Sequence, residues 1–316
     1  MAATSEEPAV RSAPPPAPGR RRYLLDREAV LGPLLLLPAV VFLAGLVGVP
    51  LVLAILYAFS DATVGSTALH LTGLDAFRRV IDDPVFRTSL RNTFVFTLVS
   101  QALVVVLSTI LAFALTAEFR GKWLVRFLIL LPWTTPVALA AIAWLWMLHS
   151  IFSPIDWVLG SVGIISKGSH IVWLGRTHLA MGSVIVVQAW RILPLATVIL
   201  MAGLTGIPRD VEEQAQIDGA GFWRKLFGVT LPLLRPVVAV AVLFGFVLAF
   251  TDMTVIYVLT RGGPQNATQV LASWAFFRGI EGGDLAQGAA VAVFMFPVLV
   301  GLTAVVLRFA RRAEVA

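Results

Sequence analysis

The sequence contains no cysteine, and charged residues make up only 13% of its 316 residues. Without cysteine the chain can form no disulfide, no thiol nucleophile and no cysteine-ligated metal site. An average soluble domain has about 25% charged residues, whereas this chain is 58% hydrophobic. The composition therefore excludes a water-soluble globule and indicates a membrane protein.

Sequence motifs for nucleotide binding and hydrolysis are also missing. No GxxxxGKS or GxxxxGKT phosphate loop, HExxH metal motif or GxSxG nucleophile motif occurs in the sequence. We therefore expect no catalytic residue, no metal site and no cofactor on this chain. The four histidines form no ligand cluster, which is typical of ordinary surface residues. A membrane enzyme or scaffold is an alternative class, but it would lack any cluster of catalytic residues.

Long apolar runs predict an all-α membrane protein with six transmembrane helices, because about 20 apolar residues cross a bilayer. The crossings are expected at residues 31–59, 93–117, 127–148, 179–204, 237–260 and 286–309. The first run is longer than the core of a signal peptide, which favours a retained helix over a cleaved signal. Pro132 and Pro136 should kink or interrupt the third crossing, because proline removes a helix hydrogen bond.

The segments around these crossings complete the predicted organisation. It consists of a disordered tail at 1–28, the first transmembrane helix at 29–60, an external loop at 61–88, a core domain at 89–309 and a short tail at 310–316. Most of the 24 lysines and arginines lie near the two termini, the loop at 118–126 and a polar island at 208–232. This excess marks their side as cytoplasmic. Both termini and the island are therefore predicted to face the cytosol, and the net charge of +6 indicates a membrane rather than nucleic acid.

The polar island at 208–232 separates the fourth and fifth crossings. Pro208 and the acidic residues after it favour the start of a helix, and Gly219 favours its end in a left-handed cap. A second short helix is expected to begin near Phe222, with Phe227 on the same side, and to stop at Pro232. Two short helices joined by a glycine suit the docking of another protein, although an ordinary amphipathic loop is the alternative.

The island resembles the EAA loop of importer-type ABC transporter permeases. The resemblance rests on Glu213-Gln214-Ala215, Ile217-Asp218-Gly219-Ala220, Phe227, Val229 and Leu231-Pro232, with Gln214 where the family usually has alanine. In that family the loop fits a cleft on a cytoplasmic ATPase subunit. The resemblance therefore implies an ATPase-coupling loop at 205–235. Its coupling residues would be Glu213, Ala215, Asp218, Gly219, Ala220, Phe222, Phe227, Leu231 and Pro232.

Two charged residues, Arg191 and Asp252, lie within predicted crossings, where insertion of a charge costs about 2.5–3.5 kcal/mol. One hypothesis is that a substrate pathway includes both charges, with aromatic rings stacking on sugar faces and polar groups binding hydroxyls. Its residues would be Gln188, Trp190, Arg191, Asp252 and Tyr257. The alternative is that the two charges are structural, paired with each other or with a sister subunit, or reaching toward a helix end. Residues 252–264 resemble a characteristic segment of carbohydrate-importer permeases.

The resemblance extends over nearly the whole chain after residue 28 and implies an ABC importer type-1 transmembrane domain. It implies a permease subunit in the bacterial cytoplasmic membrane for a mono- or oligosaccharide such as trehalose or maltose, or a related polyol. The implied partners are a second homologous permease, two ATPase subunits that hold ATP and Mg, an external solute-binding lipoprotein and the lipid bilayer, but no nucleic acid. A glycerol-3-phosphate-type ABC permease is one alternative. The other is an ion-coupled secondary transporter, for which Asp252 is the available intramembrane carboxylate.

Overall fold

The computed structural model describes residues 28–66 and 69–314, so the tail predicted at 1–28 lies outside the described residues except for Glu28. The chain divides into two compact units, Met1–Val52 and Leu53–Ala316. In the first unit, helix α1 (Glu28–Leu43) passes through a π-helical turn (Ala44–Gly48) into α2 (Val49–Ala58). The end of α2 belongs to the second unit, which contains all the other described elements.

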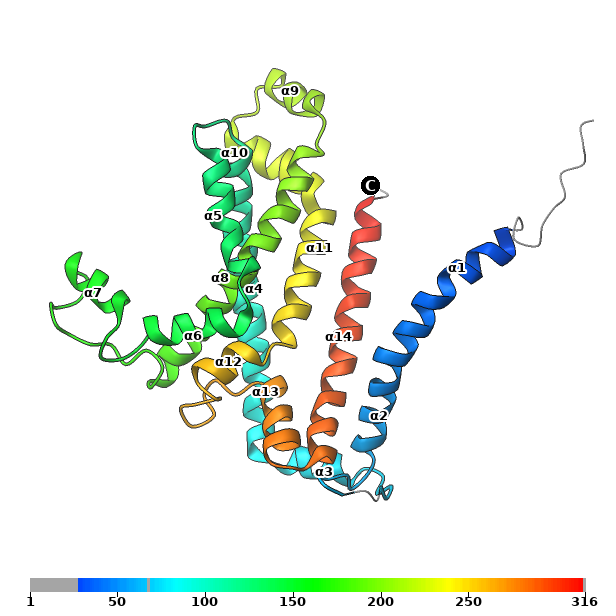
Figure 1. The fold of residues 1–316 in the computed structure, drawn as a ribbon. Helices are drawn as coiled ribbons and strands as arrows, with labels where there is room; N and C mark the ends of the chain where they lie inside the picture. Colours follow the sequence, from blue (N-terminus) through cyan, green and yellow to red (C-terminus); the bar gives the residue numbers. More distant parts are fainter. Residues whose placement is uncertain (1–27, 67–68, 315–316) are drawn as a thin grey trace, which may run out of the picture. The chain divides into compact units, whose positions relative to one another are not determined.

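The second unit is built from helices in the part of the chain that the structure describes. These are α3 (Asp75–Asp82), α4 (Pro84–Thr116), α5 (Lys122–Thr134), α6 (Val137–Met147), α7 (Pro154–Ser161), α8 (Thr177–Thr205), α9 (Arg209–Ile217), α10 (Phe222–Lys225), α11 (Leu231–Phe250), α12 (Thr254–Leu259), α13 (Leu271–Phe276) and α14 (Leu285–Glu314). Helix α4 packs along α8, and α11 contacts α4, α8 and α14 (Figure 1).

The described helices account for the predicted crossings. Five helical segments are long and apolar enough to span a membrane: Leu31–Ala58, Pro84–Thr116, Thr177–Thr205, Phe222–Phe250 and Leu285–Arg308. Helices α5 and α6 add a sixth span if they are counted together, because they are bent by 101° at a short break. The break lies between Thr134 and Val137, so the predicted interruption at Pro136 is confirmed. The prediction of an all-α membrane protein with six spans agrees with this arrangement.

Several predicted boundaries are wrong, and at the start of α4 a polar side chain begins the helix earlier than expected. The second crossing was expected from residue 93, but α4 begins at Pro84, where the side chain of Asp83 accepts a hydrogen bond from the Val85 N–H at 2.8 Å. The predicted fifth crossing at 237–260 is not one helix. Helix α11 ends at Phe250, and the segments expected as loops at 60–88, 149–177 and 261–285 contain α3, α7 and α13.

The second arm of the polar island also differs from the prediction. It does not stop at Pro232 but continues from α10 through a π-helical turn, Leu226–Thr230, into α11. The wider turn shifts the hydrogen-bond pattern, so that the N–H of Leu231 donates to the carbonyl of Leu226. Pro232, which has no N–H, then falls in the first turn of α11, where proline is tolerated.

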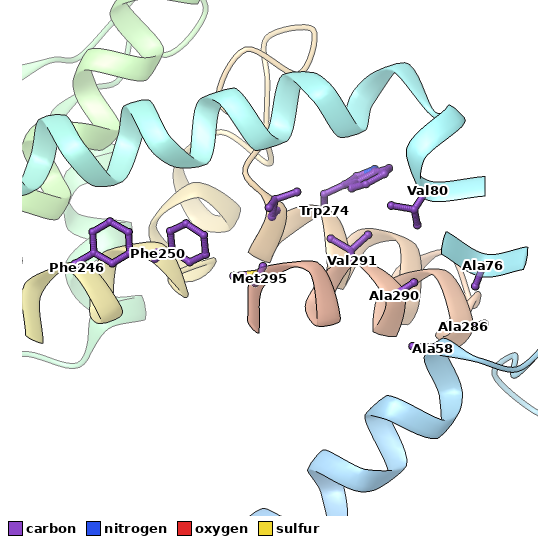
Figure 2. Close-up of a cluster of buried hydrophobic side chains, with 11 residues drawn as sticks. Ala58, Ala76, Val80, Phe246, Phe250, Trp274, Ala286, Ala290, Val291 and Met295 are labelled. Atoms are coloured by element: carbon purple, nitrogen blue, oxygen red, sulfur yellow. The ribbon is translucent and has the colours of Figure 1, made fainter. Parts of the chain in front are cut away.

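A buried apolar cluster joins α3, α11, α13 and α14 to the end of α2 (Figure 2). Its buried residues are Ala58, Ala76, Val80, Phe246, Phe250, Leu271, Trp274, Ala286, Ala290, Val291 and Met295. Alanines where α3 meets α14 allow the two helices to approach closely. At Gly288 an added Cβ would lie 2.5 Å from the Cα of Gly279, so the start of α14 passes the preceding turn at a distance that only glycine allows.

Candidate functional site

The two charges predicted within crossings form one buried ion pair. The Nη2 atom of Arg191, on α8, contacts the Oδ2 atom of Asp252, in the break between α11 and α12. Their side chains are 11% and 7% exposed. The contact corresponds to the predicted alternative in which the two charges pair with each other. It joins two helices at the point where one of them is interrupted.

Gln188 completes a small polar cluster around this pair. It lies three residues before Arg191 on α8, so the two side chains share a face, and its Oε1 accepts from Arg191 Nη2 at 3.0 Å and Nε at 3.3 Å. Gln188 is fully buried, and its Nε2 atom has no partner within the described chain. The other carboxylate oxygen of Asp252 accepts from the Val255 N–H at 3.0 Å and so begins α12. One carboxylate therefore both neutralises Arg191 and starts a helix.

The recorded side-chain contacts of the other two predicted pathway residues are with groups outside this cluster. Trp190 packs edge-to-face on Trp144 of α6, with ring centroids 5.5 Å apart. The hydroxyl of Tyr257 donates to Glu281 at 3.0 Å, and the guanidinium of Arg261 lies 5.1 Å from the centre of its ring. The structure thus brings together Gln188, Arg191 and Asp252, whereas Tyr257 belongs to a separate network with Arg261 and Glu281.

Sequence reasoning missed a buried polar face on α4. Its members, at helical spacing, are Ser89, Thr93, Thr97, Ser100, Gln101 and Ser108. Gln101 is 6% exposed, and neither of its amide atoms forms a hydrogen bond within the described chain. Gly245 of α11 passes so close that an added Cβ would lie 2.2 Å from Gln101 Oε1. Polar residues every three or four positions in an apolar run were the signal that could have revealed this face.

The polar island forms the predicted elbow. Helix α9 ends at Ile217, and Gly219 adopts φ +74°, a conformation that favours glycine. The N–H of Ala220 then donates to the carbonyl of Ala215 at 2.9 Å, and Ala215 is buried. Glu213 and Asp218 are exposed. The elbow therefore presents carboxylates to solvent beside a fixed turn.

An apolar face follows the elbow on the helix that begins at α10. Phe222, Trp223 and Phe227 are 67%, 68% and 63% exposed, and their rings adjoin, with Trp223 centred 5.1 Å from Phe222 and 6.1 Å from Phe227. We call these three residues the aromatic face. Leu231 and Pro232 lie beyond it, in a groove of about 560 Å³ that is also lined by Phe227 and by other residues of α11 and α14. The coupling residues expected from the sequence are thus divided between the elbow, the aromatic face and this groove.

The aromatic face and the ion pair are connected by one helical segment. Residues Phe222–Phe250 form a span of 29 residues, which at 1.5 Å per residue is about 44 Å long. Asp252 follows two residues after its end. A displacement of the aromatic face can therefore reach the break beside Arg191 without passing through a loop.

Comparison with known proteins gives a family and a fold. Residues 104–315 match the family of binding-protein-dependent transport system inner membrane components. The chain is 30% identical to the trehalose/maltose transport system permease protein of Thermococcus litoralis, over 90% of this chain and 95% of that protein. It is 31% identical to the diacetylchitobiose uptake system permease protein of Streptomyces coelicolor, over 94% and 92%. Its fold is similar to a chain of a bacterial ABC transporter involved in the import of the acidic polysaccharide alginate, with a TM-score of 0.76, 18% identity and coverage of 91% and 97%.

Proposed function

Because the chain belongs to the family of binding-protein-dependent transport system inner membrane components, we propose that it moves a sugar across the membrane under the control of a separate ATPase. It is a multi-pass inner membrane protein and a permease subunit of the carbohydrate type of ABC importer, and it is not an enzyme. The proposed complex contains a second homologous permease, two ATPase subunits and an external solute-binding lipoprotein. ATP and Mg bind to the ATPase subunits, and this chain holds no cofactor.

The aromatic face supports coupling at residues 205–235. The three adjoining rings are each more than half exposed and form an apolar patch, and such patches mark interaction sites. The excess of lysine and arginine near the elbow predicts that this end of the chain lies in the cytosol, where the patch would suit a groove on the ATPase. Phe222 and Phe227 would pack into that groove, while Glu213 and Asp218 would meet basic residues at its edge.

The proposed transport cycle couples two parts that each have two states, the ATPase pair and the substrate cavity between the permeases. ATP binding closes the ATPase pair, draws the elbows of the two permeases together and turns the substrate cavity outward, and hydrolysis resets it. The unbroken span Phe222–Phe250 would carry the movement to the break at Asp252. There the Arg191–Asp252 pair would hold α8 and the α11–α12 break in one arrangement until the span shifts.

The ion pair leaves no free cation in this cluster for an anionic solute. Arg191 is already paired with Asp252 and Gln188, so the cluster holds no spare positive charge for a phosphate. A glycerol-3-phosphate-type substrate remains the alternative, because relatives named for sn-glycerol-3-phosphate transport also match this chain. The relatives named for trehalose/maltose and diacetylchitobiose support a mono- or oligosaccharide, or a related polyol. The same neutralisation weighs against an ion-coupled secondary transporter, because such a site needs a carboxylate free to bind its ion.

Charge reversal at the elbow tests the coupling. We expect Glu213→Arg to reduce both recovery of the ATPase with the purified permease and ATP-dependent uptake, with unchanged permease in the membrane. Glu118→Arg is the matched control, because the Glu118 side chain, in the loop between α4 and α5, is 93% exposed and pairs only with Lys122 at the start of α5 among the described residues. Equal ATPase recovery with both variants would contradict coupling through Glu213. Mass spectrometry of the ligand held by the cognate solute-binding protein would identify the solute.

A further inference from the structure

The corner where α4 leads into α5 contains a basic groove of about 590 Å³. Its lining includes two cations, Lys122 and Arg126, and the apolar side chains of Phe119, Trp123, Phe127 and Leu130. In Figure 1 this corner lies at the same end of the second unit as the elbow. The excess of lysine and arginine at this end predicts that the groove lies at the cytosolic edge of the membrane.

The two cations of the groove lie at the end of a helix that disfavours them. Helix α5 begins at Lys122, and both cations fall within its first two turns, where the helix dipole is positive. Gly121, the N-cap residue, makes no side-chain hydrogen bond to the first N–H groups, and the first turn contains no acidic residue. The helix end and both side chains therefore favour the binding of an anion.

Within the described chain these cations are only partly neutralised. Lys122 Nζ lies 3.2 Å from Glu118 Oε1, but the Glu118 side chain is 93% exposed, and exposed pairs of this kind are weak. Arg126 Nη2 donates to the carbonyl of Leu115, at the end of α4, at 3.0 Å, whereas its buried Nε has no partner. No carboxylate in the described part of the chain pairs with Arg126. Its guanidinium is therefore available to an anion, and arginine is well suited to phosphate.

The apolar side chains extend the groove toward the membrane interior. Trp123, Phe127 and Leu130 follow one another at spacings of four and three residues, so they share a face of α5. Trp123 is 75% exposed, at the end of the helix where tryptophan is enriched beside lipid headgroups. Lys122 and Leu130 are about 12 Å apart along the helix axis, at 1.5 Å per residue. The groove thus has cations at its water end and apolar side chains along the rest of its length.

This combination selects an amphipathic anion. A soluble phosphate would bind the cations but would leave Phe127 and Leu130 uncovered. A neutral lipid would cover those two side chains but would leave Arg126 without a counterion. An anionic phospholipid does both, and basic pockets on the cytoplasmic side of transmembrane helices bind such headgroups.

We propose that this groove binds an anionic phospholipid of the inner membrane, with its phosphate at Lys122 and Arg126 and an acyl chain along Phe127 and Leu130. Because Arg126 also holds the carbonyl of Leu115, the bound lipid ties the end of α4 to the start of α5. The site depends only on the chain's place in the membrane, and not on the ATPase or the solute.

Photoactivatable lipids test this site in the assembled transporter. Vesicles of phosphatidylcholine receive a small fraction of either phosphatidylglycerol or phosphatidylcholine with a diazirine in its acyl chain, and mass spectrometry maps the adducts after digestion with chymotrypsin. Phosphatidylglycerol should label residues 119–130 more than phosphatidylcholine does, by about fivefold for each basic residue that holds the headgroup, which corresponds to about 1 kcal/mol. The middle of the span Leu31–Ala58 is the internal standard, because both lipids should label it equally.

A charge-matched pair of variants assigns the preference to the groove. Lys122→Gln should lower the preference for phosphatidylglycerol by about fivefold. Arg120→Gln loses the same charge from an exposed position in the same loop, outside the lining of the groove, and should leave the preference unchanged. Lys122 carries the test because Arg126 also supports the fold through its bond to Leu115.

Three labelling results would overturn the proposal: equal labelling of residues 119–130 by both lipids, no labelling of them by either lipid, or the same loss of preference in both variants. Inorganic phosphate, added at constant ionic strength, should not remove the preference. If it does, the groove binds a soluble anion and the lipid site is wrong. None of these outcomes changes the proposed function, which ATP-dependent uptake tests separately.

Discussion

Replacing Asp252 with asparagine tests whether the buried ion pair holds the two helices together. The substitution keeps the size of the side chain but leaves the Arg191 guanidinium buried without a countercharge. Removal of one partner from a buried pair costs about 3–5 kcal/mol, whereas exposed pairs contribute roughly 0–1 kcal/mol. With side chains 11% and 7% exposed, the pair belongs to the first class. Gln188 still accepts from Arg191, so we expect a loss of about 3 kcal/mol, at the lower end of that range.

The assay compares the thermal stability of Asp252→Asn with that of the double variant Arg191→Met, Asp252→Asn in the purified permease complex. The double variant contains no uncompensated charge, so we expect it to recover most of the lost stability. We also expect it to remain deficient in uptake, because the charged pair at the break is gone. An Asp252→Asn protein as stable as the wild type would refute the reasoning. Full uptake by the double variant would show that the pair is structural only.

Two glycine substitutions test the packing and the elbow. Gly288→Ala should destabilise the protein by about 1–3 kcal/mol, because its Cβ would lie 2.5 Å from the backbone Cα of Gly279. Thermal unfolding should show no such loss for Gly182→Ala, in α8, where a Cβ meets nothing within 4 Å. Gly219→Val forces a branched residue to φ +74° at a cost of about 1–2 kcal/mol and should lower ATP-dependent uptake without loss from the membrane. Gly73→Val, at φ +68° in open space, carries the same strain, and equal uptake by the two valine variants would exclude a special role for the elbow.

The spans and the elbow could be predicted because they depend on local composition. Apolar runs longer than 20 residues indicate crossings wherever they pack, and Gly219 between two polar helices indicates a turn. The break near Pro136 was predictable for the same reason, since proline acts on its own helix. The continuation of α10 through Pro232 was not, because a π-helical turn accommodates proline without leaving a separate mark in the sequence.

The polar cluster of Gln188, Arg191 and Asp252 depends on contacts between segments that are far apart in the sequence. Arg191 and Asp252 are 61 positions apart, and their pairing follows from how α8 packs on α11. The break after Phe250 contains no proline; it arises because the Asp252 carboxylate accepts from the Val255 N–H and begins a new helix. Tyr257 was predicted beside these residues because it is near in sequence, yet its hydroxyl bonds Glu281 instead.

ATP-dependent uptake in proteoliposomes tests most directly whether this chain is a gate driven by a separate ATPase. The permease pair is reconstituted with and without the cognate ATPase, with solute-binding protein and labelled solute outside and ATP inside. We predict accumulation of solute against its gradient only in the vesicles that contain the ATPase. Accumulation of solute by vesicles that contain the permeases alone would contradict the account.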